Sequence, residues 1–209
     1  MQEEQPEEIK LLLLGESSVG KTSIFNRYIY DKMDKNISSS IGVDFETKII
    51  KYRNKKYKIR LFDTAGQERF QSITHSYYHM GDGFLIVFDL TNEHSLNMIQ
   101  NWIESLQEKV EDCKFFIIGN KCDLEDKLIP DDVINTKLKD YNKDKKLLYK
   151  TSALKNINIS EVIEIMIDYI EDPTSIIKKV QINNSFHLKH KKEIDPQIDK
   201  ENKRKERCC

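Results

Sequence analysis

Short, almost wholly apolar runs constrain the fold of this chain more than any other feature. Three of them are IKLLLL (residues 9–14), FLIVFDL (84–90) and KFFIIGN (114–120), and a fourth candidate, KKLLYKTS, ends at Ser152. Runs of this length are typical of strands that are buried on both faces of a sheet. Strands of this kind need helices above and below them, so we expect an α/β fold.

Between these runs, apolar residues recur at helical spacing. The first set comprises Leu96, Ile99, Ile103, Leu106 and Val110. The second set comprises Val162, Ile163, Met166 and Ile170. Ser95 is the expected N-cap of the first helix, and Ser160 or Asn158 that of the second. Strands that alternate with helices predict a mostly parallel sheet with helices on both faces.

Two further strands, residues 45–52 and 57–62, flank the polar stretch RNKK. Tyr57, Ile59 and Leu61 share one face of the second strand, while Lys58 and Arg60 point the other way. This alternation indicates an antiparallel hairpin at the edge of the sheet. The prediction is therefore a six-stranded, mostly parallel sheet with one antiparallel edge strand.

Length and charge limit the remaining possibilities. A chain of 209 residues with 34 basic and 35 acidic residues has no overall field that would attract nucleic acid. The acidic start MQEEQPEE is unlike a secretory signal, and no apolar run reaches the roughly 20 residues that span a bilayer. We expect a cytosolic protein with a flexible acidic N-terminus (1–8), one domain (9–172) and a flexible tail (173–209).

The segment GESSVGKT, residues 15–22, fits the phosphate-loop pattern, with a strand before it and a helix after it. Glycine permits backbone N–H groups to turn toward phosphate oxygens, and lysine adds a positive charge. A threonine hydroxyl at the start of the helix is a suitable ligand for Mg²⁺. The expected phosphate-binding residues are Gly15, Ser17, Ser18, Val19, Gly20, Lys21, Thr22 and Ser23, with Thr22 also on the metal.

A second motif, RLFDTAGQERF, begins at Arg60. Asp63 is placed to hold Mg²⁺ through water, and the Gly66 N–H to meet a γ-phosphate. Gln67 is the candidate for orienting an attacking water, so Gln67 and Lys21 are the expected catalytic residues.

Two motifs at later strand ends indicate which base is bound. In GNKCD, Asp123 can accept from the N1–H and N2 amino group of guanine, a donor pair that adenine lacks. Asn120 can tether either the phosphate loop or the base, and the stem of Lys121 can cover the ring. In TSAL, Ser152, Ala153 and Leu154 complete the base site, with the Ala153 N–H aimed at guanine O6. Ligands bind at the carboxyl ends of strands in open α/β sheets, so the motifs predict a guanine nucleotide site.

These motifs resemble those of the Ras superfamily of small GTPases and, within it, the Rab family. The Rab-like segments are IGVDF (41–45), RFQSIT (69–74), YYHMG (77–81), IVFDLT (86–91) and the final CC. The resemblance covers residues 9 to about 170 and the terminal cysteines. It implies a small G domain of the P-loop NTPase fold, and a GTP/GDP switch that hydrolyses GTP and regulates vesicle traffic.

The resemblance also implies how such a switch works. GTP and Mg²⁺ order the loop around Ser40, a metal ligand, and the loop from Gly66 to Tyr78, and effectors read both loops. Serine stands at position 40 where the family usually has threonine. Met33 stands in place of an aromatic that packs on guanine, and Leu154 in place of a lysine. We expect weaker nucleotide retention than in typical relatives.

Several partners follow from the resemblance. They are an exchange factor, a GTPase-activating protein that works in trans, a GDP-dissociation inhibitor, an escort protein with its geranylgeranyl transferase, and effectors. Geranylgeranylation of Cys208 and Cys209, aided by basic residues in the tail, would anchor a monomer on the cytosolic face of an intracellular membrane, from which it cycles with the cytosol.

Other interpretations of the sequence remain open at this stage. The phosphate loop alone also fits a small-molecule kinase, against which GNKCD and TSAL argue. A switch that binds GTP without hydrolysing it is a second possibility, against which Gly66 and Gln67 argue. In the tail, the cysteines are either an accidental pair or, with His187 and His190, ligands for zinc, although adjacent cysteines give poor geometry for that metal.

Overall fold

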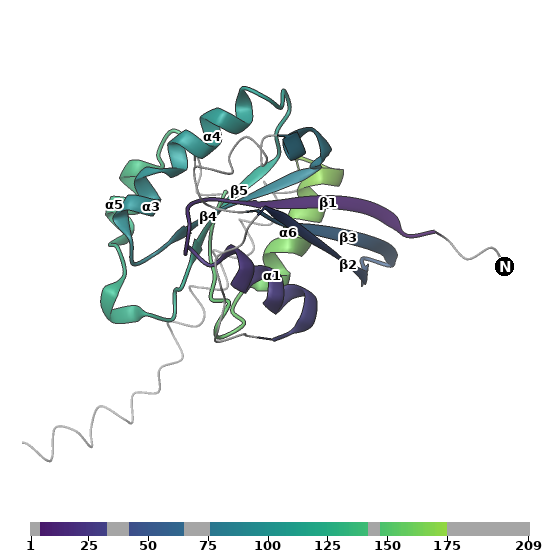
Figure 1. Cartoon of the computed structure of the whole chain (residues 1–209), viewed down its shortest axis with the longest axis horizontal. Helices are drawn as coiled ribbons and strands as arrows, with labels where there is room; N and C mark the ends of the chain where they lie inside the picture. Colours follow the sequence, from purple (N-terminus) through teal and green to yellow (C-terminus); the bar gives the residue numbers. More distant parts are fainter. Residues whose placement is uncertain (1–4, 33–41, 65–75, 142–146, 175–209) are drawn as a thin grey trace, which may run out of the picture. The chain divides into compact units, whose positions relative to one another are not determined.

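The computed structural model describes residues 5–32, 42–64, 76–141 and 147–174. Its strands are β1 (Glu7–Leu14), β2 (Val43–Tyr52), β3 (Lys55–Thr64), β4 (Gly83–Asp89), β5 (Phe115–Asn120) and β6 (Leu148–Lys150). Its helices are α1 (Lys21–Tyr30), α3 (Glu93–Asn97), α4 (Ile99–Gln107), α5 (Asp131–Lys137) and α6 (Ile159–Glu171), with short 3₁₀ turns η2 (Tyr78–Met80) and η3 (Glu125–Lys127). Figure 1 labels most of these elements.

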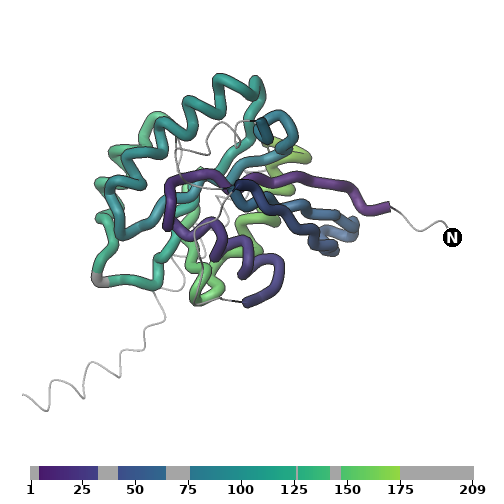
Figure 2. Tube along the Cα trace, viewed as in Figure 1, coloured from purple at the N-terminus to yellow at the C-terminus, as the bar shows by residue number. Residues whose placement is uncertain are grey.

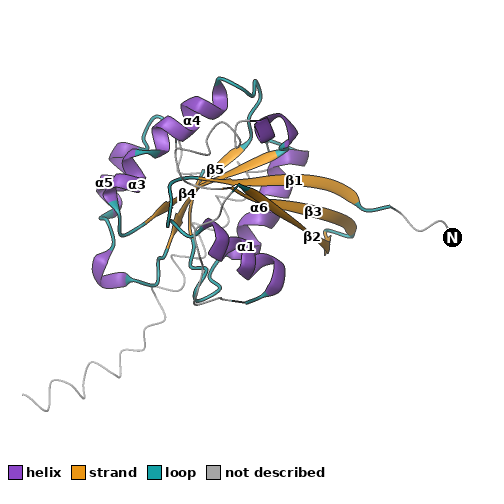
Figure 3. Ribbon diagram, in the orientation of Figure 1, coloured by secondary structure: helices purple, strands orange, loops and turns teal. Residues whose placement is uncertain are grey.

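All six strands form one sheet in the order β2-β3-β1-β4-β5-β6. β2 pairs with β3 in the antiparallel sense, and every other pairing is parallel. The predicted α/β fold, with its single antiparallel edge strand, is confirmed. Figure 3 shows the strands as a central layer with helices around it.

Helices lie on both faces of the sheet (Figure 1), and apolar side chains fill the space between each set and the strands. On one face, Leu12 and Leu14 of β1 belong to a core that includes Trp102 and Leu106 of α4 and Ile134 of α5. On the other face, α1 and α6 pack together, and Ile24, Val162 and Ile163 line a small apolar space with Leu13 and Leu85. Alternate residues of β1 thus supply both cores, which is why the run IKLLLL has no polar side.

The hairpin is longer than expected, and its turn is shorter. Lys55 and Lys56 pair with Tyr52 and Lys51, so the turn consists of Arg53 and Asn54 alone. Both turn residues have positive φ, 45° and 66°, as a two-residue hairpin turn requires. The expectation of a four-residue turn at RNKK was wrong, because the backbones of Lys55 and Lys56 join the ladder while their side chains face solvent.

The first amphipathic helix also begins earlier than expected. Asn92 is the N-cap of α3, and its Oδ1 accepts from the N–H groups of His94 (2.9 Å) and Ser95 (3.3 Å). Ser95 lies inside α3, where its Oγ donates to the Asn92 carbonyl (2.8 Å). The prediction of Ser95 as N-cap was therefore wrong, and the helical run is divided at Met98 between α3 and α4.

The cap of the last helix is Asn158, one of the two candidates, but it does not cap through its side chain. Its Nδ2 instead donates to the Lys150 carbonyl (2.8 Å), and its backbone is left-handed, with φ of 57°. No helix among the described residues combines the length and apolar character that crossing a bilayer demands. The division into residues 1–8, 9–172 and 173–209 stays a prediction, although the compact unit does reach Pro173.

Candidate functional site

The predicted motifs meet at one end of the sheet, because they follow neighbouring parallel strands. The phosphate loop follows β1, Asp63 and Thr64 end β3, Asp89 ends β4, Asn120 ends β5, and Thr151 follows β6. The trace in Figure 2 brings the turn before α1 and the ends of β4 and β5 to the same region. In an open α/β sheet, this edge is where ligands bind.

The two glycines of the phosphate loop are required by its shape. Gly15 has φ of 133°, and a Cβ there would lie 2.1 Å from the Val87 carbonyl oxygen. Gly20 has φ of 101°, and a Cβ there would lie 2.3 Å from Asn120 Nδ2. Ser18 also has positive φ, at 65°. The spacing of the two glycines thus follows from a left-handed backbone pressed against β4 and β5.

Lys21 is buried, with only 5% of its surface exposed, and lies beneath the loop. Its Nζ donates to the carbonyl oxygens of Gly15 (2.9 Å) and Glu16 (2.7 Å). Burial lowers the pKa of this ammonium group to about 8, and the carboxylates of Asp63 and Glu16 oppose the shift. The group is therefore mostly charged at neutral pH, at a position that suits an anion.

Thr22 and Asp63 are joined across the site. Thr22 Oγ1 donates to Asp63 Oδ2 over 2.7 Å, and Asp63 is 2% exposed. A hydroxyl and a carboxylate are hard oxygen donors of the kind that Mg²⁺ prefers, and the Thr22 side chain lies in the first turn of α1. These two residues fit the predicted metal site. When bound, Mg²⁺ would neutralise phosphate charge there.

Asn120 joins the phosphate loop to the base-recognition loop. Its Nδ2 donates to the Val19 carbonyl (3.0 Å), and its Oδ1 accepts from the Ala153 N–H (3.2 Å) and from Thr151 Oγ1 (3.3 Å). Of the two roles considered for Asn120, this structure shows the tether. The Ala153 N–H is directed at Asn120 rather than toward solvent, so bonding guanine O6 requires it to turn or to share its proton.

Asp123 is oriented by its neighbours. Ser152 Oγ donates to Asp123 Oδ1, and the Lys155 N–H in turn donates to Ser152 Oγ (3.0 Å). Arg27 of α1 binds the carbonyls of Ala153 (2.9 Å) and Leu154 (3.3 Å), and the Leu154 side chain is 55% exposed. The two base-recognition segments, GNKCD and TSAL, are thus brought together as predicted.

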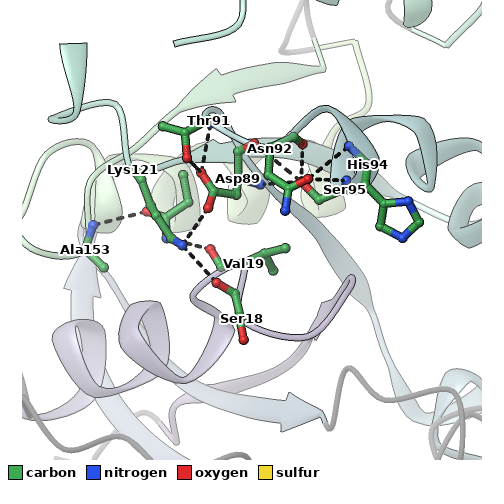
Figure 4. Close-up of polar contacts among 10 residues, drawn as sticks. Ser18, Val19, Asp89, Thr91, Asn92, His94, Ser95, Lys121 and Ala153 are labelled. Carbon is green, nitrogen blue, oxygen red and sulfur yellow. Dashed lines mark hydrogen bonds and ion pairs between the residues drawn. The ribbon is translucent and has the colours of Figure 1, made fainter. Parts of the chain in front are cut away.

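Sequence reasoning missed Asp89 at the end of β4. Its Oδ2 accepts from Lys121 Nζ (2.6 Å), which also donates to the Ser18 carbonyl (2.9 Å), as Figure 4 shows. Asp89 Oδ1 accepts from the N–H and the hydroxyl of Thr91 (both 2.8 Å). The available signal was an acidic residue at the end of a wholly apolar strand, which is costly to bury without a partner.

A second missed contact lies under the phosphate loop. Trp102 Nε1 of α4 donates to Glu16 Oε1 over 3.0 Å, and Trp102 is 3% exposed. This is the only tryptophan of the chain. Helical spacing alone does not reveal this contact, because it does not show that the indole N–H faces the loop.

The other predicted site residues divide into two groups. Ser17, Val19 and Ser23 lie in the described loop and first turn of α1. Met33, Ser40, Gly66, Gln67, Cys208 and Cys209, together with the alternative zinc ligands His187 and His190, lie outside the described residues.

Comparison with known proteins now adds to this geometry. The Ras family profile matches residues 10–172. This chain belongs to the Ras family. The small GTPase is 38% identical over 170 residues to Ras-related protein Rab-3C of Bos taurus, which covers 79% of this chain and 73% of that protein. It is 40% identical over 154 residues to Ras-related protein Rab-10 of Diplobatis ommata (73% and 76%), and 36% identical over 162 residues to Ras-related protein Rab-3A of Homo sapiens (77% and 73%).

The predicted resemblance is therefore confirmed at the level of the family and of its Rab branch. As a Ras-family small GTPase, the protein binds guanine nucleotide and hydrolyses GTP. The interpretations as a small-molecule kinase and as a switch without hydrolysis are wrong on the same finding.

Proposed function

We propose that this GTPase is a Rab-type switch that recruits effectors to an intracellular membrane and so regulates vesicle traffic. The observation that carries the proposal is the junction at Asn120, which links the phosphate loop at Val19 to the base-recognition segment at Ala153. Such a link makes binding of phosphates and recognition of guanine parts of one event, as a nucleotide switch requires. The similarity to named Rab proteins supports the trafficking role.

In this proposal, Mg²⁺ accompanies GTP or GDP and is held by Thr22, Asp63 and Ser40. Lys21 neutralises phosphate charge, and Gln67 orients the attacking water. The chain offers no evident arginine finger, so we propose slow intrinsic hydrolysis that a GTPase-activating protein accelerates in trans, by about 10³–10⁵-fold.

Effectors are proposed to bind at Phe45, an exposed aromatic residue of the hairpin that packs beside the buried Phe62. Phe45 is 53% exposed, and its ring lies 5.4 Å from that of Phe62, which lies 6.1 Å from that of Tyr77. Phe45 and Phe62 are direct partners in the ladder. An aromatic side chain such as Phe45, exposed on an edge strand, is a favourable anchor for a protein partner. An exchange factor and a GDP-dissociation inhibitor are proposed to use the neighbouring loops.

The tail is proposed to carry the membrane anchor. Cys208 and Cys209 would each receive a geranylgeranyl group after presentation by an escort protein, since two lipid chains give stable attachment where one is marginal. Intact mass of the protein from eukaryotic cells tests this: two prenyl increments are expected, and an unmodified mass contradicts the anchor.

The nucleotide site is best tested by exchanging the base rather than by abolishing binding. Xanthine carries a carbonyl where guanine carries the N2 amino group, so a donor at position 123 should suit it. We expect Asp123→Asn to weaken GDP binding by about two to three orders of magnitude and to gain affinity for xanthosine diphosphate. Calorimetry on protein stripped of nucleotide and supplied with Mg²⁺ measures both.

The matched control is Asp112→Asn, because the Asp112 side chain is 94% exposed and lies outside the site. It should leave both affinities unchanged. Retention of full GDP affinity by Asp123→Asn, or a preference of the unchanged protein for ATP, would contradict the proposed base recognition.

A further inference from the structure

We propose that one face of the β2–β3 hairpin binds an anionic membrane surface. This face, which we call the basic face, consists of Ile49, Lys51, Lys56, Lys58 and Arg60. The inference rests on the proposed function in one respect, namely that the protein is brought to a membrane at all. It adds which part of the G domain meets that membrane, and by what chemistry.

The hairpin contains many more basic residues than the average for a segment of its length in this chain. Residues 48–60 contain no acidic residue, and their basic residues are Lys48, Lys51, Arg53, Lys55, Lys56, Lys58 and Arg60. The chain average of 34 basic residues in 209 gives only about two for a segment of 13. The whole chain is nearly neutral, so this cluster is a local feature and not an overall bias.

The two sides of the hairpin differ in whether their charged side chains have partners within the domain. On the side toward α1 and α6, each charge has an internal partner. Lys48 Nζ donates to the Tyr28 carbonyl (2.6 Å), and Lys55 Nζ pairs with Glu171 (2.8 Å). At the turn, Arg53 pairs with Asp168 (3.0 Å). These contacts secure the hairpin to the rest of the domain.

On the basic face, the positive charges outnumber their partners within the domain. Lys58 and Arg60 share a single carboxylate, that of Glu8 (3.6 and 2.9 Å). Lys51 and Lys56 lie directly opposite one another in the ladder, and both are exposed. Within the described residues, the ammonium group of neither lysine has a hydrogen bond or an ion pair. Like charges opposed across a strand pair destabilise it, and an anionic surface would remove that cost.

The arrangement favours a membrane over an acidic peptide. The charges are spread along a pleated strand face and not gathered around a pocket, so they match an extended plane of headgroups. Ile49, next to Lys51 and 64% exposed, adds an apolar side chain to the same face.

α6 ends at the hairpin, on the side opposite to the basic face. Its last residue, Glu171, contacts Lys55 and Tyr57 of the hairpin. The polypeptide therefore leaves the G domain beside the hairpin, and from there it continues toward Cys208 and Cys209.

The test compares two double variants of the full chain with unmodified cysteines, verified by intact mass. Lys51→Gln with Lys56→Gln removes two charges from the basic face. Lys137→Gln with Lys139→Gln removes two exposed charges on and next to α5 and keeps the net charge matched. Partition is measured on phosphatidylcholine vesicles with and without about 30 mol % phosphatidylserine. The tail is identical in all proteins, so its contribution cancels.

We expect the hairpin variant to bind anionic vesicles about tenfold more weakly than the α5 variant, with a difference that shrinks as salt rises. Neutral vesicles should not distinguish the two. Equal partition of both variants on anionic vesicles overturns the proposal. So does a weakening of the hairpin variant on neutral vesicles that is as large as its weakening on anionic vesicles. Because the assay needs no prenyl group, failure of the proposed anchor appears separately, as an unmodified mass in cells.

Discussion

At the scale of single residues, the site combines charged groups that burial would normally disfavour. Lys21 is 5% exposed and Asp63 2% exposed, and both lie near the predicted phosphate position. Burial lowers the pKa of Lys21 because the charged form loses water, even with two carboxylates nearby. A bound phosphate would stabilise the charged form of this ammonium group and so offset the cost of its desolvation.

The lowered pKa of Lys21 makes nucleotide binding depend on pH. Phosphate raises the pKa of the ammonium group, so above pH 8 binding of Mg²⁺–GDP should take up a proton, roughly 0.7 at pH 8.5. We expect affinity to fall between pH 7 and 8.5. Calorimetric heats in buffers of different ionisation enthalpy measure the uptake, and identical heats at pH 8.5 would refute it.

The effect of the lowered Lys21 pKa on folding stability has the opposite dependence on pH from its effect on nucleotide affinity. In nucleotide-free protein the pKa of Lys21 is lower than in the unfolded chain, so the unfolded chain binds the extra proton between about pH 8 and 10.5. The contribution of Lys21 to folding stability therefore improves as pH rises through that window.

The bond from Trp102 to Glu16 provides a second residue-scale prediction. Trp102→Phe keeps an aromatic ring in the core but removes the donor to the phosphate loop. We expect mant-GDP to dissociate about fivefold faster, equivalent to about 1 kcal/mol. Glu16→Gln keeps an acceptor and serves as the milder comparison. An unchanged dissociation rate in Trp102→Phe, with unchanged unfolding in urea, would show that the bond has no role in retention.

At the scale of elements, the hairpin and α6 are joined by a polar cluster around Asp168. Asp168 is 2% exposed, accepts from Tyr52 Oη (2.9 Å) and pairs with Arg53 (3.0 Å). The same helix ends in Glu171, which binds Lys55 and Tyr57, and these hydrogen bonds hold the pKa of Glu171 below its usual value. The edge strand β2 thus depends on a helix that follows it by more than a hundred residues.

We expect Asp168→Asn to lower the free energy of unfolding by about 2 kcal/mol, because a buried ionic partner is lost. Urea unfolding at saturating Mg²⁺–GDP measures this. Asp112→Asn, at a side chain 94% exposed, should change it by less than about 0.5 kcal/mol. Equal stability of the two variants would mean that the cluster does not fasten the hairpin.

Elements differed in how well the sequence predicted them, for identifiable reasons. β1, β4 and β5 were found because apolar runs buried on both faces have no other stable location. The start of α3 was misplaced because Asn92 and Ser95 are both good caps, and the tertiary contact of Ser95 with Asp89 is invisible in a linear pattern. α5 was not predicted at all, since Ile134 is its one buried residue.

At the scale of the whole molecule, the sequence predicted which motifs meet but not how they are fastened. Asp123, Asn120 and Lys21 were assigned from residue type and strand position. The hydrogen bonds of Asp89, Glu16 and Arg27 depend on which groups of different elements face one another. No single sequence motif contains that information.

Removal of metal and nucleotide should destabilise the entire domain. A ligand at about 1,000 times its Kd adds about 4 kcal/mol to the folded state, and each kcal/mol moves the melting temperature of a domain of this size by about 2–4 °C. We therefore expect stripping with EDTA to lower Tm by about 10 °C. Mg²⁺–GDP should restore it and Mg²⁺–ATP should not. A melting temperature that is insensitive to GDP would contradict a shared phosphate and base site.

The ladder of the hairpin has a consequence for how partners respond to the nucleotide. Its final rung pairs Val43 with Thr64. Val43 follows the segment that contains Ser40, and Thr64 precedes the one that contains Gln67. The ends of two separate stretches of the sequence are therefore joined at one rung of the ladder. We therefore propose that a partner that binds at this rung responds to the two stretches together.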